Sequence, residues 1–303
     1  MLDWGVNRTL QSLLAAAFAA SLPLSHAADD TVGTLEPTLL SAYNAWRSAV
    51  LRQDPVAWER HTSAHRRMTT RHLIISQKQP YPEAIFRIAL KPPPTSNMKL
   101  LEAQANGPTA HLAYFGKVDI GEGTEGLEED IMILKFFNEQ GLWKFDSTRY
   151  MSLDNTPETR EKLKKGEAPD FLDKPQFTPP GILPETPLPC RAPEYVGGYD
   201  IQSFGYETGV KINGTDYGTI TNHDGKQIIL GGLNRGKNDL ELSIKTLDIP
   251  KDAERFLQIN VVVLTGNAQR PSIKVFSWET TADSPDEKQS FPVFVTSSTL
   301  NLK

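Results

Sequence analysis

The feature that most constrains this chain is a proline-rich stretch in its middle. Residues 154–194 contain nine prolines, and neither a long helix nor a central strand tolerates proline, which fixes φ and lacks a backbone N–H. The sequence before this stretch shows helical and then alternating periodicity, whereas the sequence after it alternates throughout. We therefore predict two domains, residues 35–153 and 195–303, joined by a linker that proline holds extended.

The first 27 residues have the pattern of a secretory signal. Arg8 precedes an apolar stretch from Leu13 to Leu24, and Ser25-His26-Ala27 resembles a cleavage site. The apolar stretch is shorter than the roughly 20 residues that a membrane-spanning helix needs. We expect residues 1–27 to be removed and the mature protein to be periplasmic or secreted, with no membrane span.

Charge and cysteine content exclude several classes of function. The net charge of −5 gives no electrostatic footprint for nucleic acid. A single cysteine, Cys190, allows no internal disulfide and no multi-cysteine metal site. The chain also lacks a Gly-x-Ser-x-Gly motif and a phosphate-binding glycine loop. We therefore predict no cofactor and assign no catalytic residue.

The first domain combines helices with an antiparallel meander. Apolar residues at helical spacing predict a helix from Leu35 to Gln53, and Asp54 with Pro55 marks the start of a second helix that runs toward Ile75. Short helices are predicted over 83–90 and 158–165, and strands over 98–106, 109–120, 131–138 and 143–151. This order of elements indicates an α+β domain.

The second domain reads as strands only. Asn213-Gly214 between alternating segments is a strong signal for a type I′ hairpin. Eight short strands with regular turns predict an all-β sandwich. The predicted strands are 199–204, 208–212, 217–221, 227–230, 239–246, 256–264, 273–280 and 291–296.

The first domain resembles the NTF2-like (cystatin-like cone) superfamily. The resemblance is carried by Tyr43-x-x-Trp46, by Asp54-x-x-x-Trp58, and by the hydrophobic strand 131–137 followed by Gly141-Leu142-Trp143-Lys144-Phe145. It implies a curved sheet around helices that enclose a conical pocket. Some members of that superfamily are isomerases or dehydratases, and many only bind ligands or assemble, which here would mean a homodimer through this domain.

The second domain looks like a galactose-binding-type jelly roll of the kind appended to glycoside hydrolases. The residues that carry this resemblance are 210–214, Gly218 and the stretch 232–242, in which a Leu-x-x-Gly-x-Asn turn leads into a strand. Gly236 and Asn238 suit that turn because glycine tolerates positive φ and asparagine bonds to nearby backbone. An immunoglobulin-like sandwich is the alternative topology.

Aromatic and histidine side chains supply the candidate ligand-binding residues. In the first domain these would line the cone, although aromatic residues at such spacing also form cores. In the second domain, aromatic rings would stack on a sugar, with the core again as the alternative. The candidates are Trp58, His61, His65, Tyr114 and Trp143 for a ligand, and Tyr206, Tyr217 and Trp278 for a glycan.

Two charged segments allow metal or anion binding. His61, His65 and His72 fall on roughly one face of the predicted second helix, which favours a solvated face, an anion-binding surface or, without an evident third ligand, a metal pair. The acidic residues of 119–130 could hold calcium or form a charged hairpin tip. We predict no metal site.

These observations favour an exported, non-enzymatic protein that binds or scaffolds. The first domain would bind a ligand or self-associate, and the sandwich would contact protein or glycan. Two alternatives remain: an enzyme with a histidine general base, His61 or His65, in the cone, and a carbohydrate-binding accessory protein.

Overall fold

The structure is a computed structural model in which strands predominate, with 45% of residues in strands and 22% in helices. It describes residues 32–87, 91–121, 125–154, 156–167, 177–250 and 253–300. The predicted signal segment, residues 1–27, lies outside these ranges. The described chain divides into two compact units: unit 1 contains residues 71–81 and 189–300, and unit 2 contains residues 32–70 and 82–188.

The helices begin and end largely as their capping residues dictate. The Oδ1 atom of Asp54 accepts a hydrogen bond from Ala57 N at 2.9 Å and caps the second helix, as predicted. That helix does not continue to Ile75, because Thr62 is extended and pairs with Phe145 of a neighbouring strand. The helices are α1 (Val32–Leu51), α2 (Pro55–His61), α3 (Ala64–Ser76), the 3-10 helix η1 (Glu83–Phe86), α4 (Pro157–Lys165) and α5 (Ser297–Leu300).

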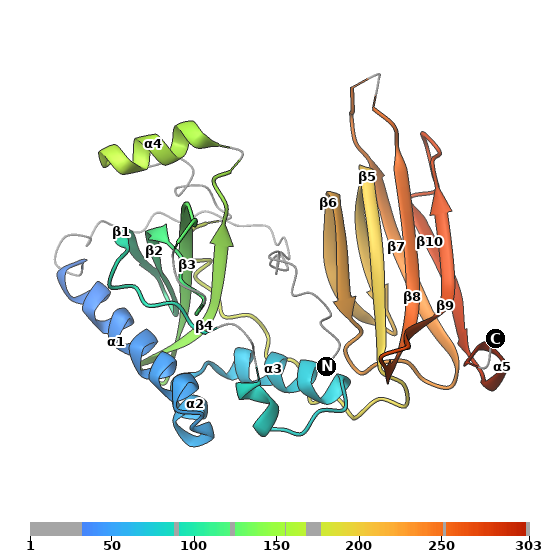
Figure 1. Cartoon of the computed structure of the whole chain (residues 1–303), viewed down its shortest axis with the longest axis horizontal. Helices are drawn as coiled ribbons and strands as arrows, with labels where there is room; N and C mark the ends of the chain where they lie inside the picture. The colour runs from blue at the N-terminus through green and yellow to red at the C-terminus, as the bar shows by residue number, and fades with distance from the viewer. Residues whose placement is uncertain are drawn as a thin grey trace. The chain divides into compact units, whose positions relative to one another are not determined.

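The sheet of unit 2 is the predicted antiparallel meander. Its strands lie in the order β1-β2-β3-β4 (Figure 1). Gln140 and Gly141, both at positive φ, form the tight turn between the last two strands. The strands are β1 (Lys99–Asn106), β2 (Thr109–Lys117), β3 (Glu129–Glu139) and β4 (Leu142–Met151), and residues 88–90 of the predicted third helix are outside the described ranges.

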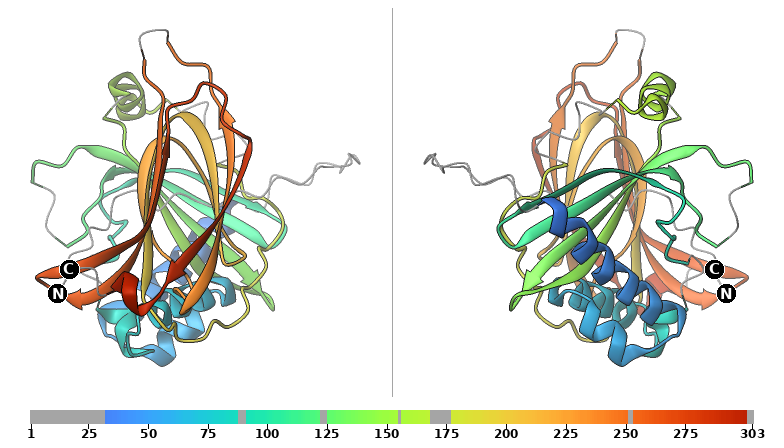
Figure 2. Two further views of the ribbon diagram at one scale, coloured as in Figure 1. Left: turned by 90° about the vertical axis from the view of Figure 1, so that its right-hand side faces the viewer. Right: turned by 90° about the vertical axis from the view of Figure 1, so that its left-hand side faces the viewer.

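One face of this sheet packs against α1, which crosses it in Figure 1 and Figure 2. Tyr43 and Trp46 from α1 meet Phe145 from β4, with ring centroids 5.3 Å and 3.9 Å from the Phe145 ring. Phe136 of β3 completes the cluster, and none of the four side chains exceeds 6% exposure. Aromatic rings therefore fill the space between α1 and the sheet.

The opposite face is covered by α4 and by part of the proline-rich segment. Leu163 of α4 and Phe177 are buried against residues of β2 and β3. Asn106 Nδ2 donates to Pro179 O at 3.1 Å, and Gly181 N donates to the Thr109 hydroxyl at 2.9 Å. Residues 177–181, which we predicted as linker, thus lie against this sheet.

Unit 1 is built around one long strand that pairs with three others. Residues 197–204 of β5 pair with β8 and residues 206–212 pair with β7, while β6 follows the other side of β5. β9 extends β8, and β10 extends β7, so the six-stranded sheet folds into two layers (Figure 1, Figure 2). The strands are β5 (Gly197–Ile212), β6 (Thr215–Ile228), β7 (Gly236–Thr246), β8 (Phe256–Asn267), β9 (Arg270–Thr280) and β10 (Lys288–Val295).

The switch between layers occurs at Gly205. This residue has φ +75°, and its N–H donates to Asn222 Oδ1 at 2.8 Å where β6 bends alongside. Because β5 and β6 bend without ending, four of the eight predicted short strands are merged into two long ones, and that part of the prediction is wrong. Asn213 and Gly214 have φ +48° and +81°, which confirms the predicted hairpin turn.

The core of unit 1 lies between its two layers and is apolar. Tyr199, Ile201 and Ile259 from one layer face residues such as Leu240 and Leu242 of the other. A β-sandwich, the coarse prediction for this part of the chain, therefore describes unit 1. In the part of the chain that the structure describes, no helix combines the length and apolar character needed to cross a membrane.

Candidate binding sites

A row of polar side chains crosses the outer face of one layer of unit 1. Strand alternation points Ile201 and Ile259 into the core and their neighbours outward. Asn260 Nδ2 on β8 donates to Asp200 Oδ1 on β5 at 2.7 Å, and Ser277 on β9 donates to Asn260 Oδ1 at 2.7 Å. Three strands thus share one hydrogen-bonded row.

A second pair extends this row. Gln258 Nε2 donates to Glu279 Oε2 at 2.8 Å, and Asn260 Nδ2 also donates to Gln258 Oε1 at 3.2 Å. Asn260 is 8% exposed, whereas Glu279 is exposed. The central amide is thereby held in place while the outer carboxylate keeps acceptor capacity for a ligand. We name these five side chains the polar row: Asp200, Gln258, Asn260, Ser277 and Glu279.

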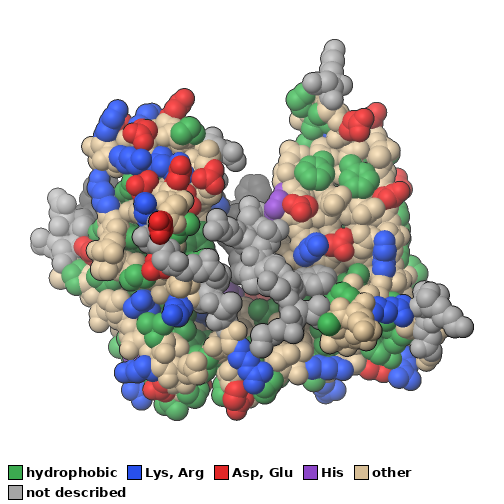
Figure 3. Space-filling model, in the orientation of Figure 1, with side chains coloured by type: hydrophobic (Ala, Val, Ile, Leu, Met, Phe, Trp, Pro, Cys, Tyr) green, Lys and Arg blue, Asp and Glu red, His purple; other side chains and the backbone are tan. Residues whose placement is uncertain are grey.

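An aromatic ring stands at one end of the polar row. Phe204 of β5 is 40% exposed and lies opposite the half-buried Phe256 of β8. Figure 3 shows hydrophobic side chains reaching the surface of unit 1 beside acidic ones. An apolar ring face next to fixed amides and carboxylates matches a ligand that has both C–H faces and hydroxyl groups.

The three residues predicted to stack on a glycan contribute to the core instead. Tyr206 is fully buried, with its hydroxyl donating to Ala282 O at 2.5 Å, and Tyr217 is 8% exposed, with its hydroxyl accepting from Leu230 N. Burial raises the pKa of both phenols. Trp278 packs beside Phe291, ring centroids 5.3 Å apart. These rings do not form an exposed platform, because their alternation places them on the inner side of the strands.

In unit 2, a β-bulge directs Asp146 toward the start of α3. Register shifts between Lys135 and Phe136, leaving Asp146 as the extra residue on β4. Asp146 Oδ1 accepts from the Ser63 hydroxyl at 2.6 Å and lies 3.0 Å from His65 Nδ1. Burial acts to raise the pKa of Asp146, but hydrogen bonds from His65 and Ser63 hold it below its usual value.

This arrangement has a clear structural role. The Ser63 hydroxyl also accepts from Arg66 N at 3.0 Å and so caps α3. Asp146 therefore anchors the helix start to the sheet. The carboxylate also fixes His65 through Nδ1, which is how proteins orient a histidine base. The His65 side chain is 30% exposed, so its ring is accessible in part.

The other predicted ligand residues of unit 2 are scattered. Trp58 and Tyr114 are buried, and burial raises the pKa of Tyr114 to about 12. Trp143 is half-buried on β4. The pKa of His61 is lowered by burial and by the charges of Arg60 and Lys144. Among the described residues, His65 is the only one of the predicted ligand residues of unit 2 that lies next to a second group able to take part in catalysis, the Asp146 carboxylate.

The predicted shared histidine face does not exist as a single helix face. The break at Thr62 separates His61 from His65. His72 is buried in unit 1, where its Nε2 accepts from Cys190 N at 3.1 Å. Within the described ranges, no group of three His, Cys, Asp or Glu residues is placed to hold a metal ion.

Sequence reasoning missed a buried histidine on β2. His111 is 2% exposed, and its Nε2 lies 3.0 Å from Glu102 Oε2. Burial is the main cause of its lowered pKa, against the opposing effect of Glu102. Next to it lies a cavity of about 20 Å³, also lined by Lys135, Phe137 and residues 177–180. That volume suits about one water molecule and not a larger ligand. Alternation could place His111 and Lys135 on one face, but it could not show that this face is covered.

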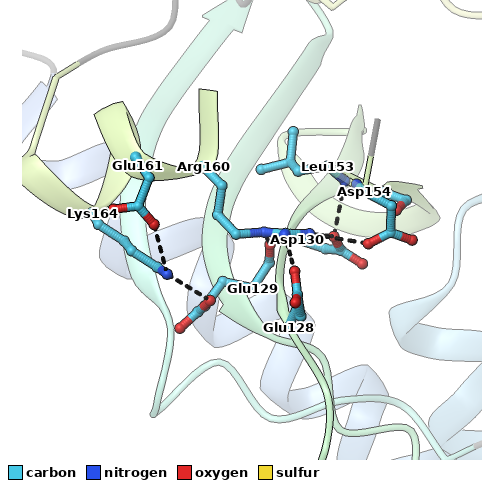
Figure 4. Close-up of polar contacts among 9 residues, drawn as sticks. Glu128, Glu129, Asp130, Leu153, Asp154, Arg160, Glu161 and Lys164 are labelled. Carbon is cyan, nitrogen blue, oxygen red and sulfur yellow. Dashed lines mark hydrogen bonds and ion pairs between the residues drawn. The ribbon is translucent and has the colours of Figure 1, made fainter. Parts of the chain in front are cut away.

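Three acidic residues at the end of the acidic loop, Glu128, Glu129 and Asp130, pair with basic side chains of α4 (Figure 4). Arg160 pairs with Glu128, lies 3.1 Å from Asp154 Oδ1 and 3.7 Å from Asp130 Oδ1, and is 8% exposed. Lys164 bridges Glu129 and Glu161 (Figure 4). The guanidinium therefore draws these three carboxylates together. Residues 122–124 of the loop lie outside the described ranges.

A shallow depression of about 400 Å³ in unit 1 is lined by residues around Arg255 and Asp283. Arg255 Nη1 donates to Gly205 O and Leu247 O, both at 2.8 Å, and its Nε donates to Asp283 Oδ1 at 3.3 Å. These bonds tie the loop after β7 to the bend in β5. The arginine is thus engaged in holding backbone rather than free for a ligand.

Comparison with protein-family models, curated proteins and solved structures finds no match to this chain.

Proposed function

We propose that this chain is an exported, non-enzymatic binding protein whose β-sandwich contacts glycan. The observation that carries the proposal is the polar row beside Phe204. Its amide and carboxylate groups are oriented by one another before a ligand arrives, which reduces the ordering cost of binding. Contact with a protein is the competing use of the same face. Export is supported by the signal pattern of residues 1–27.

We also propose a more specific fold for each of the two domains. A helical start followed by an antiparallel meander supports an NTF2-like first domain that binds a ligand or forms a homodimer. The Asn213-Gly214 hairpin supports a jelly-roll-like second domain, with the immunoglobulin-like sandwich as the alternative. Light scattering of the purified mature chain tests the homodimer, because a monomeric mass at all protein concentrations would exclude the homodimer proposal.

The test of the binding function compares two half-exposed phenylalanines in one unit. Phe204 stands beside the polar row, and Phe294 of β10, 50% exposed, lies on the other layer. We expect the mature protein to bind a subset of immobilised polysaccharides. Phe204→Ala should weaken that binding ~10-fold, since stacking contributes on the order of 1–1.5 kcal/mol. Phe294→Ala should bind normally.

A second substitution distinguishes glycan recognition by the polar row from non-specific hydrophobic binding through Phe204. Gln258→Ala removes an amide that bonds to Glu279 and leaves Phe204 in place. Reduced glycan binding in this variant supports the polar row. No polysaccharide binding by the wild type, or equal losses in the Phe204 and Phe294 variants, would exclude the glycan proposal and leave protein contact.

A second function is favoured by the His65–Asp146 pair, namely an enzyme of unit 2 with His65 as general base. Trp58, Tyr114 and Phe145 are packed core, whereas the His65 side chain is 30% exposed, so the base would act at the surface and not in a deep cone. Screening the mature protein with hydratase, isomerase and esterase substrates tests this. A genuine activity should vanish in His65→Gln and persist in His223→Gln, a surface control.

A further inference from the structure

A short segment of the proline-rich stretch covers ionisable side chains of the unit 2 sheet. Residues 177–181, here called the strap, include Phe177, which is 6% exposed and packs against β2 and β3. The imidazole of His111, in a residue that is 2% exposed, and the half-buried side chain of Lys135 lie beneath the strap. Ionisable groups normally face water, so a cover over them made by the same chain calls for an explanation.

His111 connects the strap to the sheet. Its ring hydrogen-bonds to the backbone of Phe177, and its Nε2 lies 3.0 Å from Glu102 Oε2 on β1. Both contacts favour the protonated imidazole, but burial lowers the pKa of His111 by more than they raise it. The strap contributes to that burial, because it lines the same small cavity as His111. A proton on His111 is therefore accommodated better when the strap is away and water reaches the ring.

The charges around His111 add to this effect. Glu102 of β1 and Lys135 of β3 are the charged groups that face the ring. Arg149 of β4 stacks on the strap, with its Cζ 4.7 Å from the centroid of the Phe177 ring. The strap itself has the sequence Phe-Thr-Pro-Pro-Gly and carries no charged side chain. A proton on His111 thus adds a positive charge to a covered face that already holds Lys135 and Arg149.

The other end of the strap is attached by two hydrogen bonds. Asn106 Nδ2 donates to Pro179 O at 3.1 Å, and Gly181 N donates to the Thr109 hydroxyl at 2.9 Å. The two prolines of the strap have no N–H to donate. A cavity of about 20 Å³ also lies between the strap and the sheet. Opening of the strap breaks these contacts and the packing of Phe177 but leaves the pairing of the four strands intact, so it can occur without unfolding of the sheet.

We infer that the strap is a pH-sensitive cover, which lies on the sheet at neutral pH and opens when His111 takes up a proton. Opening exposes the sheet face that carries His111, Lys135 and Arg149. With the strap open, the solvated His111 ring has its usual pKa of 6.5, so the open population rises at most ~30-fold between about pH 7.5 and about pH 5. This device belongs to unit 2 and is independent of the proposed glycan binding by unit 1.

The test follows the backbone amide of Gly181 by NMR in the mature protein, because that N–H donates to Thr109 only while the strap is in place. After correction for intrinsic exchange rates, its protection should fall ~10- to 30-fold from about pH 7.5 to about pH 5. The amide of Leu134, a fully buried residue of β3, is the reference for the sheet. It should stay more protected than that of Gly181 at both pH values.

Variants assign the effect to one histidine. In His111→Gln, the protection of Gly181 should not change with pH over this range, because glutamine takes up no proton. His61→Gln is the matched control, since His61 lies in the same unit on α2, and it should keep the pH dependence of the wild type. If His111→Gln does not fold, the comparison of Gly181 with Leu134 in the wild type decides alone.

Three outcomes would overturn the inference. The first is a protection of Gly181 that does not change with pH in the wild type. The second is a pH dependence that survives in His111→Gln. The third is equal protection of Gly181 and Leu134 at both pH values, because the strap would then open only when the whole sheet unfolds.

Discussion

The two sheets of this protein place their polar groups in opposite ways. In the four-stranded sheet, His111 and Asp146 are buried, and Lys135 is half-buried with its pKa lowered by loss of solvent. In the six-stranded sheet, among the described residues, the buried polar side chains are uncharged: Ser203, Thr208, Asn238 and Asn260. His72, a buried histidine of unit 1, lies on α3 and outside that sheet.

This difference indicates how each unit depends on its surroundings. A sheet with buried charges responds to pH and to substitutions that unbalance those charges. A sheet with an apolar core and an outer polar row instead keeps its hydrogen-bonding groups for the surface. The comparison therefore predicts that charge controls the stability of unit 2 and that backbone geometry controls that of unit 1.

The largest expected effect is that of Asp146→Ala. It removes the acceptor for Ser63 and His65 and with it the support of the α3 cap. We expect a loss of about 3 kcal/mol in the free energy of unfolding of unit 2, measured by urea denaturation.

The control for that substitution is Asp200→Ala. Asp200 is half-buried and accepts from Asn260 in the polar row, so its loss should cost below about 1 kcal/mol. Equal losses in the two variants would contradict the contrast between the sheets.

Gly205→Ala tests the backbone side of the comparison. Gly205 has φ +75°, and an added Cβ would stand 2.9 Å from Arg255 Cγ at the bend of β5. We expect unit 1 to lose about 2 kcal/mol of unfolding free energy.

Gly225→Ala on β6 is the matched substitution. Its φ is not in the strained region and its nearest contact is the flexible end of Ile220 at 3.2 Å. Thermal unfolding of both variants measures the two losses, and that of Gly225→Ala should be clearly smaller. A cost as large as that of Gly205→Ala would show that the bend does not depend on positive φ.

Arg160→Met asks whether the exposed carboxylates that Arg160 pairs with matter to unit 2 as the buried charges do. Arg160 also donates to Glu129 O at 2.9 Å, while Glu128 and Asp154 are largely exposed. We expect unit 2 to lose about 1 kcal/mol of unfolding free energy, and this loss should be smaller at high salt. It should be measurable as faster amide hydrogen exchange in α4. A loss as large as that of Asp146→Ala would mean that exposed charges determine stability here.

The sequence predicted much of the secondary structure because local signals determined it. The Asp54 cap, the four-strand meander and the Asn213-Gly214 turn all follow from periodicity and turn chemistry. The break at Thr62 was missed because Phe145, which pairs with Thr62, and Asp146, which accepts from Ser63 83 residues away, both come from a strand distant in the chain.

The binding sites were predicted less well for the same reason. Tyr206 and Tyr217 are of a residue type that often stacks on sugars, but only strand pairing shows that they face inward. The polar row is likewise spread over β5, β8 and β9, and Asp200 lies 60 residues from Asn260. His65 was identified because a histidine on a helix face is conspicuous, while its partner Asp146 was not.

The measurement that tests the contrast most directly is amide hydrogen exchange, read strand by strand, as the pH falls. His111 has a pKa below 6.5 in the folded state, so the unfolded chain binds its proton first and stability is lost as pH drops below 6.5. Asp146 has a lowered pKa as well, so a second loss begins below 3.8. Glu102 and Lys135 are the charged groups facing His111.

We predict that, after correction for intrinsic exchange rates, lowering the pH from about 7.5 to about 5 reduces protection in β2, β3 and β4. Protection in β5, β7 and β8 should stay unchanged. In His111→Gln, the loss in β2–β4 over this interval should be smaller. A uniform loss in both sheets, or a loss confined to the six-stranded sheet, would contradict the account.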